Sequence, residues 1–278
     1  MPVPAPQPVF RFAPSPNGLL HLGHAYSALL NRQLADAAGG RLLLRIEDVD
    51  RQRARDEFVR AIIDDLAWLG IAFEPEPRRQ CEHLGVYQAA LDQLDALGLI
   101  YKSTISRSAI ARLAGADPAW PRDPDGAPHP PSRFAEQPDD AASSAAIRLD
   151  MRKAMALAAS TEWMEQGQIT QLNPAVWGDV VLRSRDGVYA YHLAVVVDDA
   201  AQGISHIVRG RDLYAATAIH RVLQNVLGLP APLYHHHELI LDSGGMKLAK
   251  SRQSPTLQAL RAEGVSPRDV RRQLGFAG

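Results

Sequence analysis

Cysteine is nearly absent from this chain of 278 residues, since Cys81 is the only one. A single thiol excludes an internal disulfide framework and any metal site built from several thiolates. No apolar run approaches the roughly 18 residues of a transmembrane helix. The first ten residues also lack the cationic segment and apolar stretch of a targeting signal. We therefore expect a cytoplasmic protein with no membrane partner.

The chain also lacks an excess of positive or negative charge. The chain has 30 basic and 31 acidic residues, a net charge of −1 and a pI near 6.8, far from the basic balance of nucleic-acid-binding domains. Any contact with RNA would depend on local patches. Candidates, each of which could equally be a solvated helix face, are Arg51, Arg53, Arg55, Arg268, Arg271 and Arg272.

The first hundred residues predict alternating strands and helices. We expect strands over 9–13, 41–47 and 99–102, and helices from about His24, over 58–69 and over 84–97. Each helix is followed by a glycine suited to the left-handed conformation that closes helices, at Gly39, Gly70 and Gly98. The apolar run 41–47 lacks clean alternation, which is typical of a strand covered on both faces. This pattern predicts an α/β domain with a parallel sheet.

The composition changes after residue 102. Seven prolines between Pro118 and Pro138 disfavour helices and central strands, so we predict an irregular loop inside an inserted α+β module. Strand-like pieces follow over 146–150 and 180–183, and Asp186-Gly187 suggests a hairpin turn.

The α/β pattern then resumes. Apolar runs over 191–197 and 204–208 precede a helix that contains Leu213 and ends at Gly228. We expect a strand over 238–241 and a short helical C-terminal segment, in which Ser266-Pro267 suits a helix cap and first turn. The predicted organisation has four parts: the first half of the catalytic domain (1–102), the inserted module (103–178), the second half of the catalytic domain (179–241), and a loop with a short helical tail (242–278).

The first motif that carries chemistry is RFAPSPNGLLHLGH, residues 11–24. A loop containing two prolines and a glycine leads from a strand to two imidazoles, His21 and His24, at the start of a helix whose N-terminus favours anions. Gly23 would allow a phosphate or flat base to approach the backbone closely. The imidazoles could donate hydrogen bonds to charge that develops on a phosphate. The alternative is a pair of surface histidines.

The second motif is KLAKS, residues 247–251, which contains two of only four lysines. Lys247 and Lys250 on a flexible loop can follow moving negative charge on a triphosphate, and the loop can close over it. Taken alone, the segment could be a solvated basic loop.

Together the two motifs resemble the HIGH and KMSKS signatures of class I aminoacyl-tRNA synthetases, in the form used by glutamyl-tRNA synthetases. The segments LLLRIEDVD, DDLAWLGI, DGVYAYHLAVVVDD and HIVRGRDL agree in order and spacing. The resemblance covers most of residues 9–255 and fades around 103–170. It implies a Rossmann-like catalytic domain.

The resemblance also implies site residues. The glutamate pocket of the family falls here on Arg11, Ser15, Glu47, Tyr191 and Arg209. Two guanidiniums can bind the two carboxylates of L-glutamate, and Glu47 can accept from its α-ammonium; the alternative for Glu47 and Arg209 is an ordinary ion pair at a strand end. ATP, with Mg²⁺, would contact His21, Gly23, His24, Lys247 and Lys250, of which His21, His24 and Lys250 would be catalytic.

Chain length narrows the expectation within the family. Glutamyl-tRNA synthetases carry a large helical anticodon-binding region after the KMSKS loop, and here 27 residues follow Ser251. We therefore expect one of the truncated members, which attach glutamate to the queuosine in the anticodon of tRNA(Asp). The runner-up is a non-discriminating or fragmentary glutamyl-tRNA synthetase that charges a tRNA 3′ end.

One feature departs from the family, whose members commonly bind zinc through a Cys-x-Cys pair that follows a tyrosine. After Tyr101 those two positions are Ser103 and Ile105, so we expect no structural zinc and no metal site. Cys81 is interpreted as a semi-buried residue. His235-His236-His237 is interpreted as a polar strand end, because adjacent side chains on a strand point to opposite faces. Asp198-Asp199 is interpreted as a turn or helix cap.

Two further classes of protein remain as alternatives. A nucleotidyltransferase that makes a dinucleotide cofactor would share the HxGH motif without needing KLAKS or the glutamate pocket. A catalytically dead paralogue would act as a binding module, although both signatures are intact here.

Overall fold

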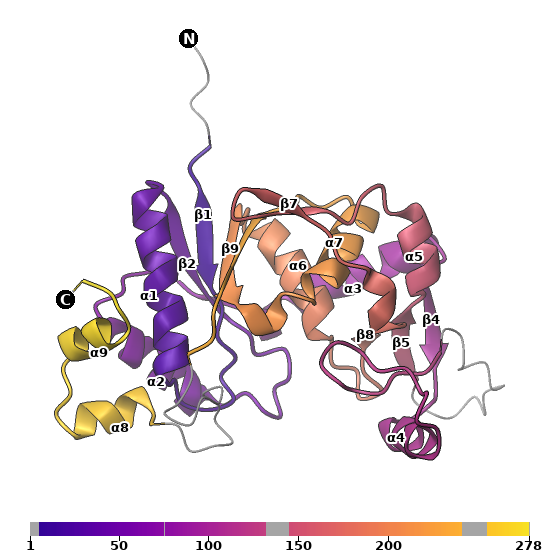
Figure 1. Ribbon diagram of the computed structural model, residues 1–278, viewed down its shortest axis with the longest axis horizontal. Helices are drawn as coiled ribbons and strands as arrows, with labels where there is room; N and C mark the ends of the chain where they lie inside the picture. Colours follow the sequence, from indigo (N-terminus) through magenta and orange to yellow (C-terminus); the bar gives the residue numbers. More distant parts are fainter. Residues whose placement is uncertain (1–5, 75, 132–144, 241–254, 278) are drawn as a thin grey trace, which may run out of the picture. The chain divides into compact units, whose positions relative to one another are not determined.

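The chain divides into two compact units. Figure 1 draws the helices and strands of the computed structural model. The structure describes residues 6–74, 76–131, 145–240 and 255–277. Unit 1 comprises Met1–Glu82, Gly203–Tyr214 and Pro232–Gly278, and unit 2 comprises His83–Gln202 and Ala215–Ala231. This division by contacts does not test the predicted boundaries at residues 102, 178 and 241, which stay a prediction.

Unit 1 is built on a parallel sheet with the strand order β3-β2-β1-β9-β10. The strands are β1 (Val9–Phe12), β2 (Arg41–Ile46), β3 (Arg78–Arg79), β9 (His206–Gly210) and β10 (Leu233–His237). The chain adds β2 and β3 on one side of β1, and β9 and β10 on the other. The order of the strands therefore reverses between β1 and β9, which is where open α/β sheets bind ligands.

One face of this sheet packs on α1 (Leu22–Ala37) and α2 (Asp56–Trp68). Phe10 and Phe12 of β1 lie in one apolar cluster with Leu42 and Leu44 of β2 and with buried side chains of both helices. Both helices are followed by a glycine with positive φ, Gly39 at 59° and Gly70 at 71°, which closes the helix as the sequence predicted.

Two short C-terminal helices complete unit 1, α8 (Leu257–Ala262) and α9 (Pro267–Gln273). Ser266 caps α9 in a capping box with Asp269, and Pro267 occupies the first turn, as predicted. Leu257 and Val270 join the apolar cluster of α1 and α2. The predicted α/β class, with its parallel sheet and short helical C-terminal segment, is confirmed.

Unit 2 contains an antiparallel sheet of order β4-β5-β8 and a β6–β7 hairpin. Its strands are β4 (Ile100–Ser103), β5 (Ala146–Leu149), β6 (Trp163–Glu165), β7 (Gln168–Thr170) and β8 (Val181–Arg183). Its helices are α3 (Leu84–Ala96), α4 (Arg107–Ala116), α5 (Met151–Leu157), α6 (Tyr191–Ala201) and α7 (Thr217–Val226). In the described part of the chain, no helix is both long and apolar enough to cross a membrane.

Four local predictions differ from the structure. The strand expected over 99–102 exists as β4, but it pairs antiparallel with β5 instead of joining the parallel sheet. The strand expected over 238–241 is wrong for its described residues, because the strand is β10, five residues earlier. Leu213 lies in a separate 3₁₀ turn, Arg211–Leu213, before α7 begins. Asp198 and Asp199 form neither a turn nor a cap, since both are buried within α6, where the hydroxyl of Tyr87 donates to Asp198.

Candidate active site

The predicted site residues of unit 1 gather at the carboxyl ends of its parallel strands. The loop that follows β1 carries Ser15 and leads to His21, Glu47 directly follows β2, and Arg209 lies near the end of β9. Since β1 and β9 flank the reversal of strand order, these side chains lie where the topology favours a ligand.

His21 and His24 form the N-terminal cap of α1. The backbone N–H of Gly23 donates to His21 Nδ1 over 3.1 Å, and the backbone N–H of His21 donates to His24 Nδ1 over 3.2 Å. The two ring centroids are 3.9 Å apart. Because both Nδ1 atoms accept hydrogen bonds, each neutral ring carries its proton on Nε2. The cap therefore fixes two N–H donors at the positive end of a helix.

Gly23 lies close against the ring of His21 in this cap. A Cβ atom at this position would lie 3.0 Å from Cε1 and 3.1 Å from Nδ1 of His21. A residue with a Cβ would therefore make a tight contact, which the His21 ring would have to relieve by a small shift.

Lys247 and Lys250 lie outside the described residues, but the segment that follows them is placed beside the histidine cap. Thr256 forms an antiparallel bridge with His21, and the N–H of Leu257 donates to the carbonyl of Leu20 over 2.8 Å. Thr256 is six residues after Lys250, a span of at most about 22 Å in an extended chain. The root of the lysine segment is thus fixed at the entrance to α1.

The second face of the parallel sheet, called the polar face below, carries arginines among apolar residues such as Val9 and Ile207. Register and strand alternation place Arg11 of β1, Arg45 of β2, and Arg209 of β9 on the face opposite Phe10 and Phe12. All three arginines are buried, with 3% of Arg11, none of Arg45 and 5% of Arg209 exposed. Burial of positive charge is costly unless anionic or polar groups compensate it. Guanidiniums bind carboxylates through paired hydrogen bonds, so this face carries groups of the type that an anionic ligand would need.

Glu47 is the carboxylate of the predicted pocket. Its Oε1 lies 3.2 Å from Nη2 of Arg45, and its backbone N–H donates to the carbonyl of Pro14 over 3.1 Å. The ordinary ion pair considered as the alternative for Glu47 is therefore present, with Arg45 as the partner. Ser15, in the preceding loop, is exposed.

Arg209 is held by three neighbours from unit 1. Its Nε donates to Nε2 of His236 over 3.0 Å, and its Nη2 donates to the carbonyl of Leu213 over 3.2 Å. Its Cζ lies 5.5 Å from the centroid of the Tyr234 ring. The sequence did not predict this role for His236, although the alternation of side chains along a strand separates His236 from His235 and His237.

Tyr191, the remaining residue of the predicted pocket, belongs to unit 2. It is the first residue of α6, and its ring makes edge contacts with His192 and His220 at centroid distances of 5.5 and 5.8 Å. Its share in a glutamate pocket stays a prediction.

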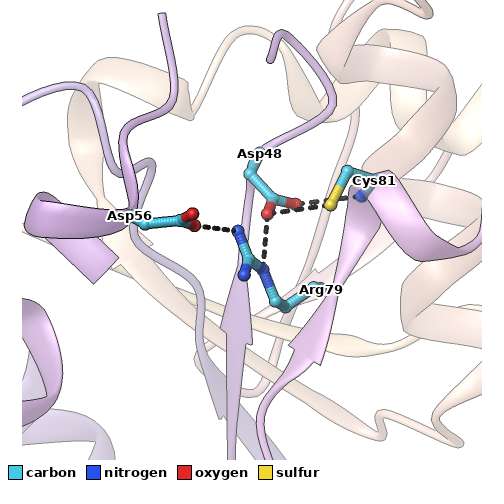
Figure 2. Close-up of polar contacts among 4 residues, drawn as sticks. All are labelled: Asp48, Asp56, Arg79 and Cys81. Atoms are coloured by element: carbon cyan, nitrogen blue, oxygen red, sulfur yellow. Dashed lines mark hydrogen bonds and ion pairs between the residues drawn. The ribbon is translucent and has the colours of Figure 1, made fainter. Parts of the chain in front are cut away.

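Asp48 anchors the end of β2 next to Glu47. It accepts hydrogen bonds from Nε of Arg79 over 2.8 Å, from the backbone N–H of Cys81 over 2.9 Å and from Sγ of Cys81 over 3.1 Å. Arg79 also reaches Asp56 at the start of α2, as Figure 2 shows. Burial, together with the hydrogen bond to Asp48, raises the pKa of the Cys81 thiol. The interpretation of Cys81 as a semi-buried residue is confirmed.

The zinc positions of the family lie in unit 2. The Tyr101 hydroxyl donates to Asp179 over 2.8 Å, and Ser103 is fully buried in β4. Among the described residues, no group of three or more His, Cys, Asp or Glu side chains is placed to hold a metal ion. The expected absence of structural zinc stays a prediction.

The candidate RNA-binding arginines are mostly exposed. This holds for Arg51, Arg53, Arg55, Arg268 and Arg272. Arg271 instead donates to the carbonyl of Leu69 and so ties α9 to the end of α2. A contact of these arginines with RNA stays a prediction.

Comparison with known proteins connects this geometry to one family. A family model described as the catalytic domain of class I tRNA synthetases (E and Q) matches residues 9–278. The chain is 45% identical over 279 residues to a Glutamyl-Q tRNA(Asp) synthetase of Rhodobacter capsulatus, covering 96% of this chain and all of the relative. A protein of the same name from Symbiobacterium thermophilum is 37% identical over 96% of this chain and 85% of its own length.

Solved structures support the same fold. The chain is similar to a glutamate-tRNA synthetase of Elizabethkingia anophelis, with a TM-score of 0.74 and 26% identity over 89% of this chain. A glutamate tRNA ligase of Elizabethkingia meningosepticum, in complex with its amino acid, matches with a TM-score of 0.73 and 26% identity over the same share. The chain spans about half of each of these two solved chains, 53% and 52%.

Proposed function

Because this chain belongs to the class I tRNA synthetases for glutamate and glutamine, we propose that it couples L-glutamate to queuosine in the anticodon of tRNA(Asp). As a member of this family it is an aminoacyl-tRNA synthetase, a ligase that uses ATP. The proposal adds the amino acid, the acceptor and the residues. The acceptor group is a hydroxyl on the cyclopentene ring of queuosine.

L-Glutamate binds on the polar face of the sheet. Arg11 and Arg209 each receive one of its two carboxylates, because a guanidinium can bind a carboxylate through two parallel hydrogen bonds. Glu47, oriented by Arg45, accepts from the α-ammonium. Ser15, in the loop after β1, is the remaining residue that unit 1 contributes to the proposed pocket.

ATP binds at the start of α1. The Nε2–H groups of His21 and His24 donate to phosphate oxygens, and Gly23 leaves the backbone accessible to the nucleotide. Lys247 and Lys250 reach the phosphates from the loop whose root lies at Thr256. Mg²⁺ accompanies the phosphates, which it binds together with water, and we assign no protein ligand to it.

The reaction has two steps. An α-carboxylate oxygen of glutamate attacks the α-phosphorus of ATP in line, the bond to the bridging oxygen breaks, and pyrophosphate leaves with its charge held by Lys250 and the histidines. The queuosine hydroxyl then attacks the carbonyl carbon of the glutamyl-adenylate, and AMP leaves. The protein supplies positioning and positive charge, and no covalent nucleophile.

One observation carries the proposal. Buried guanidiniums on the polar face of the sheet and a histidine cap that presents two donors meet at the carboxyl ends of the strands that flank the reversal of strand order. An amino acid with two carboxylates fits the guanidiniums, and a nucleotide with a charged triphosphate fits the histidine cap.

The acceptor is tested with labelled glutamate, ATP, and tRNA(Asp) with and without queuosine. Label that appears only on queuosine-containing tRNA(Asp) and is located in the anticodon supports the proposal. Label at the 3′ end of tRNA(Glu) would instead establish a glutamyl-tRNA synthetase, the function named by the solved relatives.

The role of the lysine loop is tested separately. Lys250→Ala should strongly depress the glutamate-dependent exchange of pyrophosphate into ATP, with Lys153→Ala as a matched control from unit 2. Near wild-type exchange by Lys250→Ala would refute the assignment of that lysine.

A further inference from the structure

The pair formed by His236 and Arg209 extends the glutamate site beyond the residues that could contact the substrate. His236 is buried in β10, level with Arg209 in the adjacent strand β9. Its ring is stacked parallel to that of Tyr234, with centroids 5.9 Å apart, and meets Tyr214 edge-on at 5.2 Å. Aromatic packing thus fixes the plane of the imidazole.

The hydrogen bond to His236 engages the Nε donor of the Arg209 guanidinium. A guanidinium binds a carboxylate through two parallel N–H groups, either Nε with one Nη or the two Nη atoms. Nε of Arg209 already donates to Nε2 of His236 over 3.0 Å. A substrate carboxylate would therefore not bind Arg209 through Nε, and Nη2 also donates to the carbonyl of Leu213 over 3.2 Å.

The chemical nature of the acceptor matters as much as its position. Since Nε2 of His236 accepts a hydrogen bond, the ring is neutral there and carries its proton on Nδ1. A carboxylate in the same place would orient Arg209 equally well, but it would compensate the positive charge that attracts the substrate. Arg45 shows the other arrangement, since its guanidinium faces the carboxylate of Glu47.

We propose that His236 is a positioning residue that orients Arg209 through Nε with a neutral acceptor, which adds no negative charge beside the guanidinium. This inference rests on the proposed binding of glutamate by Arg209. His236 itself touches neither glutamate nor ATP.

The test compares KM for glutamate with KM for ATP in the exchange of pyrophosphate into ATP. Three variants of His236 separate the possible roles: His236→Gln keeps a neutral acceptor at a similar reach, His236→Leu removes the acceptor, and His236→Glu replaces it with a charged one. His235→Gln is the matched control, because His235 lies on the other face of β10. Melting temperatures show whether each variant is folded.

We expect His236→Leu to raise KM for glutamate by about 10- to 100-fold, the effect of losing a hydrogen bond to a charged group. KM for ATP should stay within about twofold of wild type, because the histidine cap and lysine loop are unchanged. His236→Gln should restore most of the affinity for glutamate, whereas His236→Glu should not. His235→Gln should resemble the wild type.

Two results would overturn the inference: wild-type KM for glutamate in both His236→Leu and His236→Glu, or an equal rise of both KM values. If His236→Leu does not fold, the comparison of His236→Gln with His236→Glu decides, and equal KM values in these two variants would refute the role of charge. A wild-type protein that shows no glutamate-dependent exchange, with or without tRNA, would instead refute the proposed function.

Discussion

The two faces of the parallel sheet in unit 1 come from the same strands and differ in almost every other respect. Phe10, Phe12 and Leu44 point to one face and pack on α1 and α2 in a continuous apolar cluster. Arg11 and Arg209, only one residue away from apolar neighbours in each strand, point to the other. Alternation along a strand thus puts the apolar cluster on one face and the arginines that we propose to bind glutamate on the other.

The difference also shows what each face needs from its surroundings. The apolar face is stabilised by contact with the helices and tolerates conservative changes of shape. The polar face holds guanidiniums whose orientation depends on specific hydrogen bonds, such as those from Arg209 to His236 and to the carbonyl of Leu213. We therefore expect substitutions on the two faces to separate activity from stability.

The largest expected effect is on the polar face. Arg11→Met keeps most of the side-chain volume and removes the charge, so kcat/KM for glutamate should fall by about a thousandfold through loss of a paired contact with a carboxylate. The exchange of pyrophosphate into ATP measures this fall in kcat/KM. The melting temperature should remain near that of the wild type, since an apolar side chain of similar volume replaces a buried charge. Exchange within about tenfold of wild type would contradict the role of Arg11.

The matching change on the apolar face is Leu42→Ala. Leu42 is buried in β2 against α1 and α2, so its truncation should lower the free energy of unfolding by about 2 to 5 kcal/mol. Chemical denaturation measures this change. KM for glutamate should not move in the protein that stays folded. A large rise of KM without loss of stability would show that the two faces are not separate in function.

A smaller effect, on the pH dependence of stability, is expected at Asp65 of α2. This side chain is 1% exposed. Neither of its carboxylate oxygens has a hydrogen-bond partner among the described residues. Burial raises the pKa of Asp65 from 3.8 to about 6, and Arg261 of α8 opposes the rise. The folded protein therefore binds a proton more tightly than the unfolded chain. This contribution to stability is complete below pH 4 and is lost as the pH rises through 6.

Asp65→Asn should remove that pH dependence. The variant should exceed the wild type in free energy of unfolding by roughly 1 to 3 kcal/mol at pH 8, and the difference should shrink towards pH 4. Denaturation at both pH values tests this expectation. A constant difference between the two proteins would contradict the raised pKa.

The smallest effect concerns the rim of the sheet, where Asp48 follows Glu47 at the end of β2. The pKa of Cys81 is raised, first by burial and then by the hydrogen bond to Asp48. Asp48→Asn should lower that pKa and speed the reaction of Cys81 with a disulfide reagent at pH 8 by about threefold. Since Cys81 is the only cysteine, the rate reports on this thiol alone. An unchanged rate in a folded variant would rule out this effect of Asp48.

Much of the apolar face could be predicted from the sequence. The helices α1, α2 and α3 and the glycines that close them follow from local patterns, because apolar spacing and a left-handed glycine act over a few residues. The capping role of Ser266 is equally local. The two histidines at the start of α1 were also predicted, since their motif is contiguous.

The polar face was harder to predict because its buried polar residues are stabilised by partners that are distant in sequence. The strand was expected over 238–241, where the chain is apolar, whereas β10 contains His235, His236 and His237. A polar residue such as His236 can occupy a buried strand because Arg209, distant in sequence, supplies its hydrogen bond. Asp198 is likewise buried in α6 because Tyr87 of another helix donates to it.

The binding of glutamate on the polar face is tested most directly by comparing L-glutamate with L-glutamine in the exchange of pyrophosphate into ATP. Two arginines that each bind a carboxylate should make glutamate better in kcat/KM by at least about a hundredfold, because glutamine replaces one carboxylate with a neutral amide. The preference should collapse in either Arg11→Met or Arg209→Met, whichever arginine receives the side-chain carboxylate. Equal exchange with both amino acids in the wild type would contradict the assignment of the polar face to glutamate.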